Sequence, residues 1–111
     1  MKVLLIIFFA VIPLFSFSQK MKDGTYDFRI AYEEWNGKIM GHCKVQIKSD
    51  SIIVFKENSS TEKIDSGLLI RHQSGKWIIA KTFNDKFAKI IGACADASII
   101  IDLKKRIIYL C

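Results

Sequence analysis

The chain lacks most of the patterns that carry chemistry in small proteins. It has no glycine-rich phosphate loop and no Cys-x-x-Cys pair, which argues against nucleotide-binding and thioredoxin-like activities. Its two histidines, His42 and His72, stand without the neighbouring ligands or acids that metal binding or acid–base catalysis requires. We therefore expect no cofactor and no metal, and a binding role is favoured over an enzymatic one.

The amino-terminal segment also lacks an apolar run long enough to span a membrane. The run over positions 3–17 is about 15 residues long and contains a proline, whereas a spanning helix needs roughly 20 residues. A lysine precedes the run, and the small residues Ser16 and Ser18 complete the three parts of an export signal. We predict a signal peptide over residues 1–18, cleaved after Ser18 or Gln19, and hence a secreted or periplasmic protein.

Acidic residues are in the minority, and basic residues are spread along the chain. Without Lys2, 16 of the 17 Lys and Arg residues remain against 11 Asp and Glu, a net charge of about +5. The one dense basic run, Lys104-Lys105-Arg106, falls at an expected hairpin turn, where it serves either as a solvated tip that discourages edge pairing or as a binding patch. Export argues against nucleic acid, so we expect a protein or an anionic envelope component as partner.

Three cysteines permit one internal disulfide and leave one thiol over. An exported chain meets oxidising conditions, so a bridge is expected. Cys94 and Cys111 bracket the last expected hairpin, and joining them would close a loop of about 18 residues, worth roughly 3 kcal/mol. We predict this pairing, with Cys43 as a buried free thiol. The other two pairings and an unbridged chain are the alternatives.

The region after the signal peptide begins with a pattern of hairpins. Apolar and polar residues alternate over 25–35 and again over 38–48, with the turn sequence Asn36-Gly37 between them. A two-residue turn there would pair Phe28 with Val45, and Ile30 with Cys43, and both apolar faces then lie on one side. A second turn at 49–50 adds a strand over 51–56, with Ile52 opposite Ile47 and Val54 opposite Val45.

Further short strands follow along the rest of the chain. A polar loop spans 57–65, and a hairpin over 67–73 and 76–83 turns at Ser74-Gly75. Residues 84–91 form either a loop or a short helix capped by Asn84 or Asp85, and a last hairpin joins 98–102 to 106–110. We predict a single all-β domain over 19–111, an antiparallel meander of about seven short strands that forms a small barrel or a two-sheet sandwich.

Candidate functional residues are few. Glu33 and Glu34 are adjacent on a strand, so their carboxylates should point to opposite faces and not share a substrate. His72 lies within reach of Trp77 across the second hairpin, and His42 should face solvent while Cys43 faces the core. We expect a non-enzymatic binding protein with an interaction surface formed by Trp35, His42, Lys104, Lys105 and Arg106. The alternatives are a small secreted hydrolase, a thiol-based enzyme, or a carrier of a small ligand, which would need a cavity.

Overall fold

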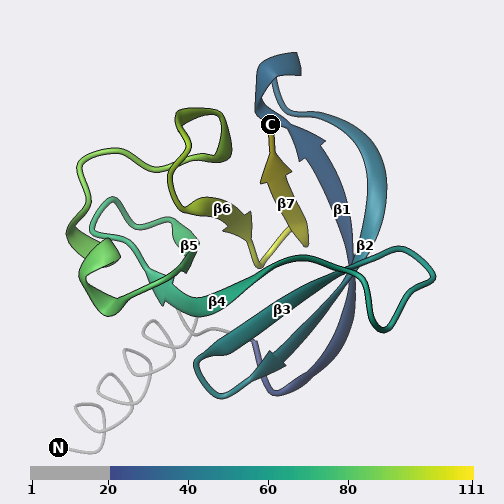
Figure 1. Ribbon diagram of the computed structural model, residues 1–111. Coiled ribbons are helices and arrows are strands. Elements are labelled where there is room, and N and C mark those ends of the chain that lie inside the picture. Colours follow the sequence, from purple (N-terminus) through teal and green to yellow (C-terminus); the bar gives the residue numbers. More distant parts are fainter. Residues whose placement is uncertain (1–20) are drawn as a thin grey trace, which may run out of the picture.

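A computed structural model describes residues 21–111, which form a closed barrel of seven strands (Figure 1). The predicted signal peptide, residues 1–18, and its cleavage site lie outside the described residues. Neighbouring strands follow the order of the sequence. The strands are β1 (Gly24–Tyr32), β2 (Lys38–Lys48), β3 (Ser51–Lys56), β4 (Lys63–Arg71), β5 (Trp77–Ala80), β6 (Ile99–Asp102) and β7 (Ile107–Leu110).

The predicted all-β meander is confirmed, and of the two architectures it is the barrel. Consecutive strands pair antiparallel, and the barrel closes where β1 pairs parallel with β7. The only helical elements within the described part are the 3-10 turns η2 (Glu33–Trp35), η3 (Phe83–Phe87) and η4 (Ala93–Ala95). Between residues 21 and 111, no helix has the length and apolar character needed to cross a membrane.

Apolar side chains at alternate strand positions fill the inside of the barrel. In β1, Phe28 and Ile30 are buried while Asp27 and Arg29 are exposed, as the period of two predicts. Burying a side chain of this size contributes about 1.5–3 kcal/mol. Each strand contributes one of the largest fully buried residues of this core, namely Phe28, Ile47, Ile52, Leu69, Ile79, Ile101 and Ile108.

The first hairpin has a longer connection than the sequence predicted. Asn36 and Gly37 adopt left-handed backbone, with φ of 56° and 75°, but η2 occupies the three residues before them. Phe28 therefore lies opposite Cys43 and not Val45, so the predicted pairs were wrong by two residues. Because side chains alternate with a period of two, this shift still leaves both apolar faces on one side.

The next two strands follow the predicted register. Ile52 pairs with Ile47 and Val54 with Val45, across a turn in which Ser49 has a φ of 55°. β4 begins at Lys63, inside the predicted polar loop, and β5 ends at Ala80. The last hairpin, β6–β7, lies where the sequence placed it, with its turn over 103–106.

The segment 84–91 contains a 3-10 turn and not an α-helix. The N-cap is Thr82, which forms a capping box with Asp85, so neither Asn84 nor Asp85 is the cap. The turn ends at Ala88, whose backbone is extended. The segment runs beside the β4–β5 turn, where the Gln73 backbone N–H donates to the Lys86 carbonyl at 3.0 Å.

Candidate functional site

Five basic side chains gather on one outer side of the barrel, and we call this surface the basic face. Pairing of β1 with β2 places Arg29 beside His42, and both are exposed. Closure of β1 onto β7 brings in the β6–β7 turn, where Arg29 donates its backbone N–H to the Arg106 carbonyl at 2.9 Å. The Arg29 guanidinium also donates to the Lys105 carbonyl at 3.2 Å. The basic face comprises Arg29, His42, Lys44, Lys105 and Arg106.

One carboxylate, that of Asp27, lies among these cations. It pairs with Lys44, which is its neighbour across β1 and β2. The hydrogen bond from Lys44 lowers the pKa of Asp27 below its usual value, with smaller contributions from the charges of Lys44, Arg106 and His42. Asp27 thus interacts with three of the basic side chains. A second carboxylate, that of Asp102, accepts the Lys105 backbone N–H at 2.9 Å in the β6–β7 turn, so the basic side chains still outnumber the acids on this surface.

Arg106 is held in place by two local features. Its guanidinium lies over the ring of Tyr26, 5.2 Å from the ring centroid. Its backbone is left-handed, with a φ of 56°, as the tight turn before β7 requires. The Tyr26 hydroxyl in turn donates to the Lys22 carbonyl at 2.7 Å. The Arg106 guanidinium is therefore oriented by contacts within the protein.

The predicted interaction surface is only partly brought together. His42, Lys105 and Arg106 belong to the basic face, but Lys104 lines a pocket next to Trp77. Trp35 is 52% exposed and lies in η2, in the connection between β1 and β2. This connection forms one end of the long first hairpin (Figure 1). The Trp35 ring is 6.0 Å from that of Tyr32. Trp35 therefore belongs to a separate exposed apolar tip that includes Ile39 and Met40.

Sequence reasoning missed Arg29 and Lys44 because each is isolated in the chain. The alternation pattern already placed both side chains on the outer face of two paired strands, and this could have indicated that they lie close together. The shift of two residues in register does not alter this, because it leaves each side chain on the same face of the sheet. Their proximity to the β6–β7 turn was not visible, because the contact between Arg29 and Lys105 spans 76 residues.

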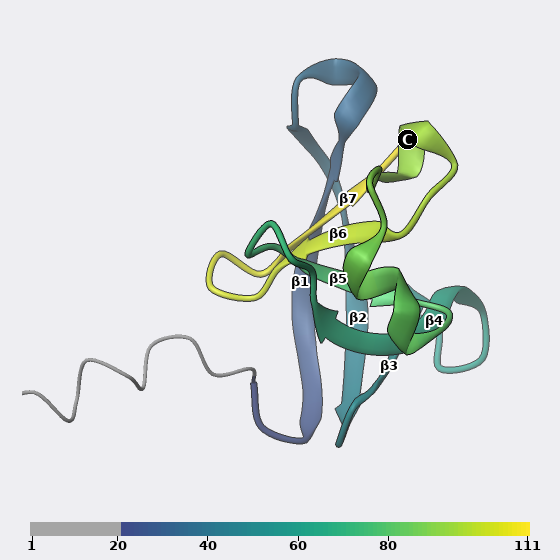
Figure 2. The same ribbon diagram turned by 90° about the vertical axis from the view of Figure 1, so that its left-hand side faces the viewer.

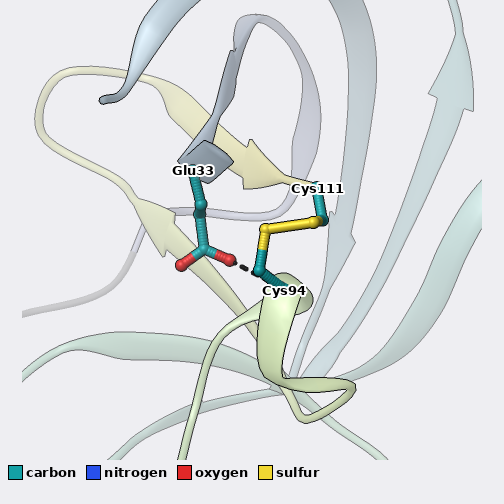
Figure 3. Close-up of a disulfide and its surroundings, with 3 residues drawn as sticks. All are labelled: Glu33, Cys94 and Cys111. Atoms are coloured by element: carbon teal, nitrogen blue, oxygen red, sulfur yellow. Dashed lines mark hydrogen bonds between the residues drawn. A yellow bond between two sulfur atoms is a disulfide. The ribbon is translucent and has the colours of Figure 1, made fainter. Parts of the chain in front are cut away.

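The disulfide joins Cys94 to Cys111, as predicted, with their Cα atoms 4.9 Å apart. Glu33 of η2 accepts a hydrogen bond at 2.9 Å from the Cys94 backbone N–H (Figure 3). Gly92 lies directly under this carboxylate with a φ of 117°, and an added Cβ would come within 2.9 Å of Glu33 Oε2. Glu33 thus has a structural role, and the bridge ties the end of β7 to η4 beside the tip of the first hairpin.

The remaining histidine and cysteine are buried. Trp77 pairs with Arg71, and the His72 backbone N–H donates to the Lys76 carbonyl, so His72 does not lie opposite Trp77 across the two strands. Its Nδ1 accepts the Ser74 N–H at 3.1 Å, and its Nε2 then donates to the Ala88 carbonyl at 2.7 Å. Cys43 is a free thiol in the core, as expected, and burial raises its pKa to about 11. It is protonated at neutral pH and so is not an activated nucleophile.

Pockets open on the surface of the described residues near both ends of β5 and β6. The larger, about 760 Å³, lies beside the β4–β5 and β6–β7 turns, and its wall includes Trp77, Leu103 and Tyr109. The smaller, about 390 Å³, includes Asp65, Lys81 and Asp85, which are engaged in an ion pair and in backbone hydrogen bonds. No group of three or more His, Cys, Asp or Glu within 21–111 is arranged to hold a metal ion.

Comparison with known protein families, with characterised proteins and with solved structures finds no match to this chain.

Proposed function

We propose that this protein is an exported, non-enzymatic binding domain whose basic face engages an anionic component of the cell envelope or its surroundings. The observation that carries the proposal is that β1, β2 and the β6–β7 turn place Lys44, His42 and Arg106 close enough to lower the pKa of Asp27, while Arg29 and Lys105 are exposed in the same three segments. A cluster of like charges opposes folding and attracts anionic partners. The fold brings Arg29 and Lys105 together although they are 76 positions apart in the chain. A role in binding explains this arrangement better than a role in stability.

Export is the second element of the proposal. The predicted signal peptide over residues 1–18 supports it, and the Cys94–Cys111 disulfide is the kind of bridge that persists in oxidising compartments. In such a compartment the anionic macromolecules are lipids, acidic polysaccharides and acidic proteins, and nucleic acid is not the expected partner. Binding through exposed charges should weaken as salt rises, because the Debye length falls to about 8 Å at physiological ionic strength.

The test measures binding of the purified protein to dextran sulfate, a polyanion without lipid or base character. The variant Lys105→Glu with Arg106→Glu reverses two charges in an exposed turn and leaves the strands intact. We expect it to weaken binding at low salt about tenfold, a loss of about 1.4 kcal/mol.

The matched control is Lys86→Glu with Lys89→Glu, which makes the same change in charge near η3, away from the basic face. It should weaken binding by less than about threefold. An equal loss in both variants would mean that net charge alone drives binding and would refute a specific basic face.

A further inference from the structure

The most exposed large apolar side chains in residues 21–111 lie together in one short segment. Phe83, Phe87 and Ile90 are 63%, 65% and 64% exposed, and we call these three residues the apolar platform. Burying a side chain of this size contributes about 1.5–3 kcal/mol to the free energy of folding or binding. Three such side chains in water therefore leave several kcal/mol available for binding. Three such side chains within eight residues are more than the single exposed apolar residues that a protein surface normally carries, which favours an interaction site here.

The platform is fixed in position by hydrogen bonds along its length. At its start, the Asp85 carboxylate accepts the Lys81 N–H at 2.8 Å and the Thr82 N–H at 3.2 Å. At its end, the buried His72 donates to the Ala88 carbonyl at 2.7 Å. Between them, the Gln73 N–H donates to the Lys86 carbonyl at 3.0 Å. The exposed side chains therefore project from an ordered backbone, and little further ordering is needed on binding.

The exposed charges interleaved with the platform residues are positive, whereas Asp65, Asp85 and Asp96 line the pocket beside Ile90, with Asp65 paired to Lys81. Lys86 and Lys89 are exposed between its apolar residues, and the Lys86 ammonium lies 5.8 Å from the ring centroid of Phe87. The one acid within the turn, Asp85, is bound to backbone N–H groups, and these hydrogen bonds lower its pKa. The segment thus presents aromatic and aliphatic groups beside long basic side chains, the combination found in elements that enter the headgroup region of anionic membranes.

We propose that the apolar platform docks this protein onto an anionic lipid bilayer, with Phe83, Phe87 and Ile90 inserted at the interface and Lys86 and Lys89 against lipid phosphates. Charge complementarity favours this partner over a neutral apolar surface. The inference goes beyond the proposed function, because it concerns a different surface and a different interaction.

The platform lies on the other side of the barrel from the basic face. η3 packs against β4 and β5, which are far from β1 and β2 in the closed strand order. Figure 2 shows η3 in front of the barrel with β1 and β2 behind it. A protein docked through the platform would therefore turn its basic face away from that membrane and leave it free to bind a second, anionic partner.

The test uses vesicles of phosphatidylcholine with about 30% phosphatidylglycerol, mixed with the purified protein and collected by sedimentation. The variant Phe83→Ser with Phe87→Ser should lower the vesicle-bound fraction at least tenfold in partition coefficient. These side chains are exposed, so thermal unfolding should be unchanged. The matched control, Trp35→Ser with Met40→Ser, removes two exposed apolar side chains from the far hairpin tip and should bind within about twofold of the unchanged protein.

Three results would overturn the proposal: binding that is insensitive to the two Phe changes, an equal loss in the Trp35 and Met40 control, or an unchanged protein that ignores these vesicles. Any of these would leave a protein partner as the remaining occupant of the platform. At about 0.5 M NaCl, attraction through exposed charges is strongly screened, whereas apolar insertion persists. The Lys105→Glu and Arg106→Glu variant should keep this salt-resistant binding, so failure of the platform and failure of the basic face are distinguishable.

Discussion

The basic face and the apolar platform are assembled in different ways. The basic face draws on β1, β2 and the β6–β7 turn, and its defining contact joins Arg29 to Lys105, 76 residues away. The platform lies within residues 83–90, and the hydrogen bonds that hold it reach no further than the neighbouring β4–β5 turn. One surface therefore depends on closure of the whole barrel, and the other on short-range contacts at one place in the chain.

This difference predicts that the two surfaces can be damaged separately. Loosening of barrel closure should affect the basic face first, because β7 carries the β6–β7 turn into contact with β1. Loosening of the β4–β5 turn should affect the platform first, since His72 and Gln73 are its supports. The predictions below begin with the largest expected effect.

Removal of the disulfide should weaken the pairing of β7 with β1, which closes the barrel. The variant Cys94→Ser with Cys111→Ser frees the end of β7 and should lower the free energy of unfolding by about 3 kcal/mol, measured by urea denaturation. We expect dextran sulfate binding to weaken about threefold while vesicle binding stays the same. A stability loss below about 1 kcal/mol, or equal losses at both surfaces, would contradict the distinction drawn between them.

Replacement of His72 should damage the platform alone. His72→Ala leaves the Ala88 carbonyl and the Ser74 N–H without their buried partner, which should cost about 2 kcal/mol of stability. Vesicle sedimentation should fall several-fold, and dextran sulfate binding should be unchanged. The exposed His42, changed in the same way, serves as the control and should leave stability and vesicle binding unaltered. If His72→Ala weakens both kinds of binding equally, the platform is not an independent unit.

Neutralisation of Asp27 should raise the affinity of the basic face for anions and leave vesicle binding by the apolar platform unchanged. Asp27→Asn removes the one negative charge beside Lys44 and should strengthen dextran sulfate binding about two- to threefold at neutral pH. A titration calorimeter measures this directly. Unchanged or weaker binding would show that Asp27 orients Lys44 more than it opposes the ligand.

The effect of Asp27→Asn on affinity should depend on pH. The pKa of Asp27 is lower in the folded protein than the usual aspartate value of 3.8, so its ion pair stabilises the fold above that value. This contribution is lost as the pH falls through the lower, folded pKa. The unchanged protein and Asp27→Asn should therefore differ in affinity at pH 7 and converge in strongly acidic solution, where dextran sulfate remains charged. A difference that persists there would exclude Asp27 ionisation as its cause.

Much of the fold was predictable from local patterns. Alternation gave the strands and the inward faces, because side chains on a strand point to opposite sides in turn. The disulfide was predictable because Cys94 and Cys111 flank one hairpin. The register of the first hairpin was not, because Glu33 binds the distant Cys94 N–H and η2 lengthens the loop. The same reasoning missed the roles of His72, Arg29 and Lys44, whose partners lie in other segments.

The amino-acid sequence by itself determined the all-β meander, the composition of the core, the pairing of the cysteines and the exposure of His42. These features depend on residues close together in the chain: side chains alternate along a strand, particular residues favour turns, and a hairpin brings its two ends together. Only the tertiary structure decided that β1 meets β7 in parallel and that Arg29, His42 and Arg106 share a surface. Only it decided that Phe83, Phe87 and Ile90 stay in water, since burial depends on what the rest of the barrel leaves uncovered.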